Sequence, residues 1–196
     1  MRNPIFAAVT LLAVTALLAG CASDPLADQY KEGSDKNYIS GSGITEVPLA
    51  ERGEPVAFEA ETDAGDAVSS DDYAGEVLIV NFWYAACPPC RVEAPDLQDL
   101  SEEFEGDGVS FLGVNVRDQA ETSFNTTKEW GITYPSVVDV NDGNMLLAYA
   151  GTVAPNAVPT TLVIDKQGRV AARYLGLVES PSILRTLIKD ALAEDD

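Results

Sequence analysis

The chain lacks histidine altogether and has only three cysteines in 196 residues. The absence of histidine excludes Cys–His and Ser–His catalytic pairs. Basic residues are scarce as well, since 12 Lys and Arg face 32 Asp and Glu, and the formal charge is −20. Such an acidic protein is not expected to bind nucleic acid or anionic lipid through its charge. Hydrophobic residues make up 46% of the chain, which is enough for the core of one globular domain.

Two of the cysteines stand close together in the stretch Cys87-Pro88-Pro89-Cys90. The apolar run 77–83 precedes them, so the pair is predicted at the junction of a buried strand and a helix. A helix N-terminus has unpaired N–H groups and a partial positive charge, and both stabilise a thiolate. The thiolate is the species that attacks disulfides. The motif therefore indicates thiol–disulfide exchange.

Two alternatives for the pair stay open. One is half of a zinc site, but structural zinc needs four ligands and no second ligand pair stands at a suitable spacing. The other is an inert structural disulfide, for which two intervening prolines and a helix start are unusual. We therefore expect neither a metal nor another cofactor.

The first 20 residues are predicted to be a signal peptide outside the fold. Their apolar stretch, residues 5–18, is short for a membrane-spanning helix. The residues Leu18-Ala19-Gly20-Cys21 resemble the lipobox of bacterial lipoproteins, in which the bond before the cysteine is cut and the cysteine is lipid-modified. The resemblance implies a protein anchored through Cys21 to the outer face of the cell membrane. An ordinary signal peptide with a chance cysteine is the alternative.

Residues 21–53 are expected to form a flexible, lipid-anchored tether, because they are polar and have no hydrophobic period. Residues 54–196 are expected to form one folded domain. Its predicted elements are a hairpin at 56–60 and 67–69, strands at 76–82, 109–116, 160–165 and 169–175, helices at 88–104, 121–130 and 181–192, and short pieces at 134–139 and 144–149. This order predicts a mixed sheet covered on both faces, a three-layer α/β sandwich.

Residues 81–95, which carry the Cys pair, resemble the active-site segment of the TlpA/ResA group of thioredoxin-fold proteins. Further similar pieces lie at 114–116, 134–135, 158–160 and 162–168. Members of this group are extracytoplasmic, membrane-anchored thiol–disulfide oxidoreductases. The resemblance implies a thioredoxin-like three-layer α/β/α sandwich with a mixed central sheet and an added N-terminal β-hairpin.

The resemblance also implies catalytic roles for four residues. Cys87 is expected to be the exposed nucleophile, and Cys90 the more buried thiol that resolves the mixed disulfide. Pro159 is expected to be cis and to face the dithiol, with an ordinary trans proline as the alternative. Glu93, one helical turn after Cys90, is expected to tune the thiol pKa and carry protons. A surface glutamate is the alternative for Glu93.

Neighbouring residues are given supporting roles. Asn81 stands where cytoplasmic thioredoxins carry a buried aspartate, and it cannot ionise, which leaves Glu93 as the proton carrier. Trp83 is expected to shield the dithiol, with plain core packing as the alternative. Val158 is expected to offer its backbone to the substrate.

Three further residues flank the cysteines. Arg91 is expected to favour a thiolate through its positive charge. Pro88 and Pro89, together with the family resemblance, favour a reductant over an oxidant. Many members of the group carry Trp directly before the first cysteine, whereas this chain has Ala86, which is expected to make Cys87 more accessible.

The sequence therefore predicts a redox-active enzyme that reduces disulfides in partner proteins, for example an apocytochrome c during cytochrome c biogenesis. A membrane protein that passes electrons across the bilayer is expected to reset the dithiol. An oxidant that forms disulfides in secreted proteins is the main alternative. A copper chaperone, a peroxidase and a module that only binds partners are further alternatives. The missing histidine argues against the copper chaperone, and the C-x-x-C spacing argues against the peroxidase.

Overall fold

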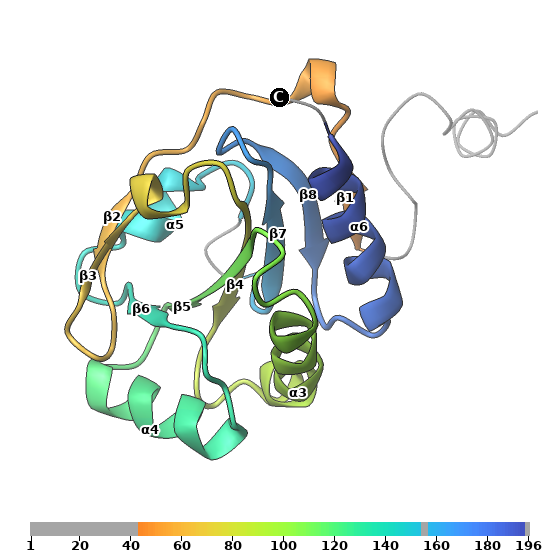
Figure 1. Cartoon of the computed structure of the whole chain (residues 1–196). Helices are drawn as coiled ribbons and strands as arrows, with labels where there is room; N and C mark the ends of the chain where they lie inside the picture. The colour runs from red at the N-terminus through yellow and green to blue at the C-terminus, as the bar shows by residue number, and fades with distance from the viewer. Residues whose placement is uncertain (1–42, 154–156, 195–196) are drawn as a thin grey trace, which may run out of the picture. The chain divides into compact units, whose positions relative to one another are not determined.

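The computed structural model describes residues 43–153 and 157–194 (Figure 1). The described residues all belong to one compact unit, Ile39–Asp196. The predicted signal peptide, Cys21 and the tether as far as residue 42 lie outside the described residues. Among those described, no helix combines the length and the apolar character needed to cross a membrane.

A six-stranded mixed sheet forms the centre of the domain, with the order β1-β8-β7-β4-β5-β6. Its strands are β1 (Ile44–Glu46), β4 (Val77–Trp83), β5 (Val109–Asn115), β6 (Ser136–Val138), β7 (Thr160–Ile164) and β8 (Val170–Leu175). β5 runs parallel to β4 and β6, whereas β7 and β8 are antiparallel to their neighbours. All seven residues of β4 are buried, as expected for a central strand covered on both faces.

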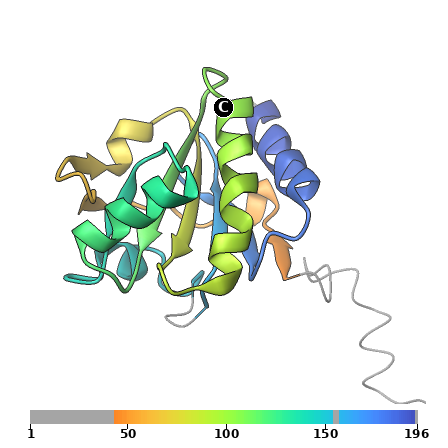
Figure 2. The ribbon, with the colours of Figure 1, turned by 90° about the horizontal axis from the view of Figure 1, so that it is seen from below.

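Helices α3 (Pro88–Glu103) and α6 (Pro181–Ala193) lie side by side on one face of the sheet, as Figure 2 shows. Leu100 of α3 and Ile188 of α6 pack with Ile79 of β4 in one buried core. Helix α4 (Ala120–Trp130) lies next to α3 and to the edge strand β6. The helices predicted at 88–104, 121–130 and 181–192 are confirmed as α3, α4 and α6.

The opposite face is covered by α5 (Asn144–Ala148) and by a hairpin of β2 (Glu59–Glu61) and β3 (Ala67–Ser69), which η2 (Ser70–Tyr73) follows. Phe58, Met145 and Tyr149 pack there against Phe82 and Leu112 of the sheet. The three-layer sandwich and its added hairpin are thus confirmed. The hairpin is fixed to the sheet edge by a bridge between Thr62 and Val137.

The folded part begins earlier than the boundary predicted at residue 54. β1 pairs antiparallel with β8, and Ile44 is buried in the core. The short helix η1 (Leu49–Glu51) follows, and the Arg52 guanidinium contacts the carboxylates of Asp165 and Glu194. Residues 44–53 therefore pack on the domain. The sequence did not reveal this, because a three-residue strand is too short to show an alternating pattern.

Candidate functional site

Cys87 and Cys90 form a disulfide at the point where β4 gives way to α3, with Cα atoms 5.3 Å apart. Cys87 is the N-cap residue of α3, and its sulfur accepts a hydrogen bond from the Cys90 N–H at 3.2 Å. Pro88 and Pro89 occupy the first two helical positions, where neither has an N–H to donate. Cys90 is therefore the first residue of the helix whose backbone can donate to the Cys87 sulfur.

Both cysteines are buried, which corrects the expectation of an exposed Cys87. Cys87 is 1% exposed and Cys90 is 2% exposed. Their side chains pack with Trp83, Trp130 and Val158, and the two indole rings lie 5.3 Å apart. The flanking Ala86 and Pro88 remain exposed, so the backbone around the pair is open to a partner.

The Val158–Pro159 peptide bond is cis, as predicted. Pro159 is buried directly before β7, the antiparallel neighbour of β4, and its carbonyl accepts a hydrogen bond from the Gly176 N–H at 2.9 Å. Since Val158 packs against the cysteines, the cis-proline segment adjoins the dithiol.

Glu93 is buried under α3 rather than exposed on the surface. One carboxyl oxygen accepts a hydrogen bond from the Asn81 amide at 2.9 Å, and the other accepts one from the Val178 N–H at 3.0 Å. Burial raises the pKa of Glu93 to about 7, although the hydrogen bonds from Val178 and Asn81 act in the opposite direction. Asn81 also donates to the Thr161 hydroxyl at 3.0 Å, so the amide joins the helix to β7.

A small hollow lies beside Cys90 and Asn81, the residue whose amide donates to Glu93. It has a volume of about 10 Å³ and is lined by Cys90, Asn81, Trp83, Trp130 and Tyr134, among others. That volume suffices for about one water molecule. The hollow therefore has room for one water molecule next to Cys90, and Glu93 is not among its lining residues.

Arg91 does not turn its charge toward the sulfurs. Its side chain is 69% exposed, and the guanidinium lies 3.6 Å from the Glu129 carboxylate. An exposed, paired guanidinium offers little stabilisation to a buried thiolate. Arg91 is adjacent to Cys90 in the sequence, but the direction of its side chain could not be predicted from the sequence.

Two side chains that were not predicted from the sequence, Asp118 and Ser136, hold the segment before Cys87. The Ala85 N–H donates to the Asp118 carboxylate at 2.6 Å, and the Trp83 indole N–H donates to the Ser136 hydroxyl at 2.9 Å. The pattern Asn115-x-x-Asp118 after a strand is a signal for side chains that bond to nearby backbone N–H groups. Nothing in the sequence indicated Ser136.

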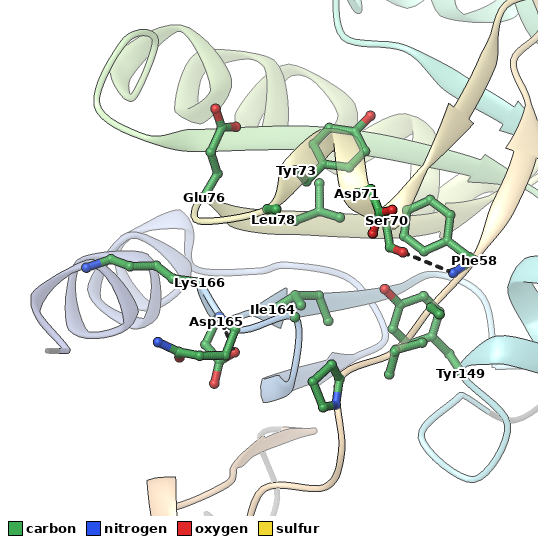
Figure 3. A pocket seen from close by; sticks show the side chains of 16 residues that line it. Phe58, Ser70, Asp71, Tyr73, Glu76, Leu78, Tyr149, Ile164, Asp165 and Lys166 are labelled. Carbon is green, nitrogen blue, oxygen red and sulfur yellow. Dashed lines mark hydrogen bonds between the residues drawn. The ribbon is translucent and has the colours of Figure 1, made fainter. Parts of the chain in front are cut away.

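A larger hollow lies at the opposite end of β4, with a volume of about 210 Å³ (Figure 3). Phe58, Tyr73 and Tyr149 form its aromatic walls, and Leu78, near the start of β4, forms part of its lining. No cysteine is among its lining residues. The candidate reactive site is therefore the dithiol and not the larger hollow.

The similarity to known proteins agrees with this geometry. The model of the AhpC/TSA family matches residues 53–173. The thiol-disulfide oxidoreductase ResA of Geobacillus thermodenitrificans is 33% identical over 143 residues, which cover 68% of this chain and 79% of ResA. A DsbF homologue from Corynebacterium diphtheriae superposes with a TM-score of 0.67 at 32% identity, covering 78% of this chain and 96% of the homologue.

A secreted thiol-disulfide isomerase from Corynebacterium glutamicum superposes with a TM-score of 0.72 at 29% identity. The superposition covers 80% of this chain and 96% of the isomerase. The family match covers residues 53–173, which include Cys87, Cys90 and Pro159. The chain therefore belongs to the AhpC/TSA family and is a thiol–disulfide oxidoreductase of the ResA type.

Proposed function

We propose that this oxidoreductase reduces disulfides of partner proteins outside the cytoplasm. In the reduced enzyme the Cys87 thiolate attacks one sulfur of the partner disulfide, and the other partner sulfur leaves and takes up a proton. Cys90 then gives up its proton and attacks the Cys87 sulfur, which releases the second partner thiol. The partner gains two electrons and two protons, and the enzyme ends with the Cys87–Cys90 disulfide.

The small number of charged groups and backbone donors around the Cys87 sulfur, where Cys90 is the first helix residue with an N–H to donate, is the observation that supports this direction. A strong oxidant of this fold is one whose reduced form is stabilised. Here Pro88 and Pro89 remove two N–H donors from the helix N-terminus, and Arg91 pairs with Glu129. Trp83 lies with both cysteines in one buried cluster, and Trp130 packs against that cluster. The dithiol is consequently a better electron donor than acceptor.

Glu93 would serve as the proton carrier for Cys90. It stands one turn after Cys90 on the same helix, and a carboxyl with a pKa of about 7 both accepts and releases a proton near neutral pH. In the reducing direction the Glu93 carboxylate accepts the proton that Cys90 gives up. When the dithiol is reset, the same carboxyl returns the proton.

The reduction potential of the Cys87–Cys90 pair tests the direction of electron flow. The protein is equilibrated with mixtures of oxidised and reduced dithiothreitol, and the fraction of disulfide is measured by thiol alkylation. We expect a potential of about −250 mV or lower. A potential near about −120 mV would contradict the proposal and favour a disulfide-forming oxidant. The variant with both cysteines changed to serine controls for alkylation at other sites.

The partner class follows from the TlpA/ResA resemblance and is proposed as a secreted protein whose cysteines must stay reduced, such as an apocytochrome c. A Cys90→Ser variant should trap the partner as a mixed disulfide on Cys87. A Cys87→Ser variant should trap none, and equal trapping by both variants would contradict the order of attack. A membrane protein that delivers electrons is the second expected partner.

The location is proposed from the lipobox-like residues before Cys21, which lies outside the described residues. Processing at this cysteine would leave the domain lipid-anchored on the outer face of the membrane. We expect the full chain to incorporate labelled palmitate and to sediment with membranes, and a Cys21→Ser variant to do neither. Palmitate incorporation by Cys21→Ser equal to that of the wild type would contradict the anchor.

A further inference from the structure

The loop that leads into Cys87 is held by a side chain from a distant part of the chain. The Ala85 N–H donates to one oxygen of the Asp118 carboxylate at 2.6 Å, across 33 residues of sequence. Asp118 follows the end of β5, and Ala85 lies between the end of β4 and the N-cap of α3. This hydrogen bond holds Ala85, which lies two residues before Cys87. The Cys87 sulfur is the nucleophile of the proposed mechanism.

Asp118 is itself fixed by Asn115, which is fully buried at the end of β5. The Asn115 amide donates to the same Asp118 oxygen at 3.0 Å. The Asn115 side-chain oxygen accepts hydrogen bonds from the Arg117 N–H at 3.1 Å and the Asp118 N–H at 2.8 Å. The Asn115 backbone carbonyl accepts from the Asp139 N–H at 2.8 Å, next to the end of β6. The Asp118 carboxylate is therefore positioned by Asn115 at the end of β5, and not by the 84–86 loop that it holds.

A second contact joins the same two segments. The Arg117 guanidinium lies over the Tyr84 ring, 4.1 Å from its centroid, in a cation–π arrangement. Two consecutive residues before the dithiol, Tyr84 and Ala85, are thus held by Arg117 and Asp118. Since the Cys87 N–H also donates to the Tyr84 carbonyl at 3.2 Å, the contacts extend to the cysteine itself.

We propose that Asp118 is a positioning residue for thiol–disulfide exchange at Cys87. Attack on a disulfide requires the thiolate to approach the S–S bond in line, and a small misplacement of the nucleophile costs much of the rate. Asp118 acts through its acceptor oxygen, which keeps the 84–86 loop in place while the substrate approaches. The inference rests on the proposed role of Cys87 as the attacking thiol.

The test compares Asp118→Ala with Asp118→Asn in the pre-reduced full chain, with oxidised glutathione as the probe disulfide. The rate of mixed-disulfide formation is measured against pH. The limiting rate at high pH, where Cys87 is ionised, reports the position of the thiolate. The midpoint of the profile reports the ionisation of Cys87, so a change in ionisation is separated from a change in position.

Asp118→Ala is expected to lower the limiting rate about tenfold, because the loop loses a charge-assisted hydrogen bond. Asp118→Asn keeps an acceptor oxygen and is expected to stay within about twofold of the wild-type limiting rate. Asp99→Ala, an exposed carboxylate on α3, serves as the matched control and should leave both quantities unchanged.

A wild-type limiting rate in Asp118→Ala would overturn the proposal. So would an Asp118→Asn rate as low as that of Asp118→Ala, because the charge and not the acceptor would then be responsible. The Cys87→Ser variant tests the proposed attack by Cys87 separately from the role of Asp118. If Cys87→Ser reacts as fast as the wild type, Cys87 is not the attacking thiol and both proposals fall.

Discussion

Glu93 is buried among apolar side chains while its carboxyl oxygens accept hydrogen bonds from Asn81 and Val178. Burial favours the neutral acid, and the two hydrogen bonds favour the carboxylate. Burial has the larger effect, so the pKa rises to about 7. A residue that looks like an ordinary helical glutamate in the sequence is consequently half protonated near neutral pH.

The free energy of unfolding should therefore depend on pH through Glu93. The folded pKa of about 7 lies above the ordinary value of 4.5. At low pH the carboxyl is protonated in both states, and as the pH rises toward 7 the unfolded state loses its proton first, so stability falls. The difference between the two pKa values corresponds to about 3 kcal/mol. We expect Glu93→Gln to remove this fall.

Urea denaturation of the oxidised protein at several pH values measures the effect. The Gln side chain cannot accept both hydrogen bonds, so the variant starts from a lower stability. The stability of the variant relative to the wild type should nevertheless rise by up to about 3 kcal/mol between roughly pH 5 and pH 8. Glu105→Gln, an exposed carboxyl near the end of α3, should show no such rise. Parallel stability curves for Glu93→Gln and the wild type would contradict the raised pKa.

At the scale of elements, Gly113 lets β5 pass close under the indole of Trp83. A Cβ atom at Gly113 would lie 2.9 Å from the Ser136 hydroxyl oxygen and 3.1 Å from the Trp83 indole nitrogen. These two atoms form the hydrogen bond that ties Trp83, on β4, to β6. The cover over the dithiol thus depends on the absence of a side chain in the middle strand.

Gly113→Ala should destabilise the protein by about 1–3 kcal/mol, because the added methyl must displace a buried side chain. The near-ultraviolet circular dichroism of the Trp83–Trp130 pair should change at the same time. Gly53→Ala is the matched control, since a Cβ there would meet no atom within 4 Å. Equal stabilities of the two variants, measured by chemical denaturation, would show that Trp83 is not held in this way.

Long elements could be predicted from the sequence because each carries its own pattern. The apolar run of β4 and the Cys87 N-cap placed the dithiol at a strand–helix junction, and Ser180-Pro181 marked the start of α6. β1 could not be predicted, because three residues carry no period. Its place depends on pairing with β8, more than a hundred residues further along the chain.

The residues of the candidate site also differ in whether they could be predicted from the sequence. Cys87, Cys90 and Pro159 lie in local motifs and could be named from the sequence. The burial of Glu93 depends on Val178, 85 residues away, and the support of Ala85 depends on Asp118. Such contacts are set by how the elements pack, and spacing along one element does not reveal them.

At the scale of the whole domain, one buried ion cluster joins three parts of the chain. The Arg52 guanidinium, in the segment after η1, lies 2.9 Å from the Asp165 carboxylate at the β7–β8 turn. It also contacts Glu194, next to the end of α6. The Asp165 side chain is fully buried and is also held by the Arg169 guanidinium at 2.8 Å. Arg52 therefore connects the N-terminal segment to the C-terminal helix.

Arg52→Ala should lower the free energy of unfolding by about 2–3 kcal/mol. Asp165 would keep Arg169 and the backbone N–H groups of Gln167 and Arg169, which limits the loss, but one buried carboxylate oxygen would lose a charged donor. Urea denaturation measures the change. Arg185→Ala removes an ion pair with Glu103 that is more than a third exposed, so it should cost less than about 1 kcal/mol. If the two substitutions cost the same, the N-terminal segment is not held by this cluster, and the earlier start of the folded domain would depend on β1 alone.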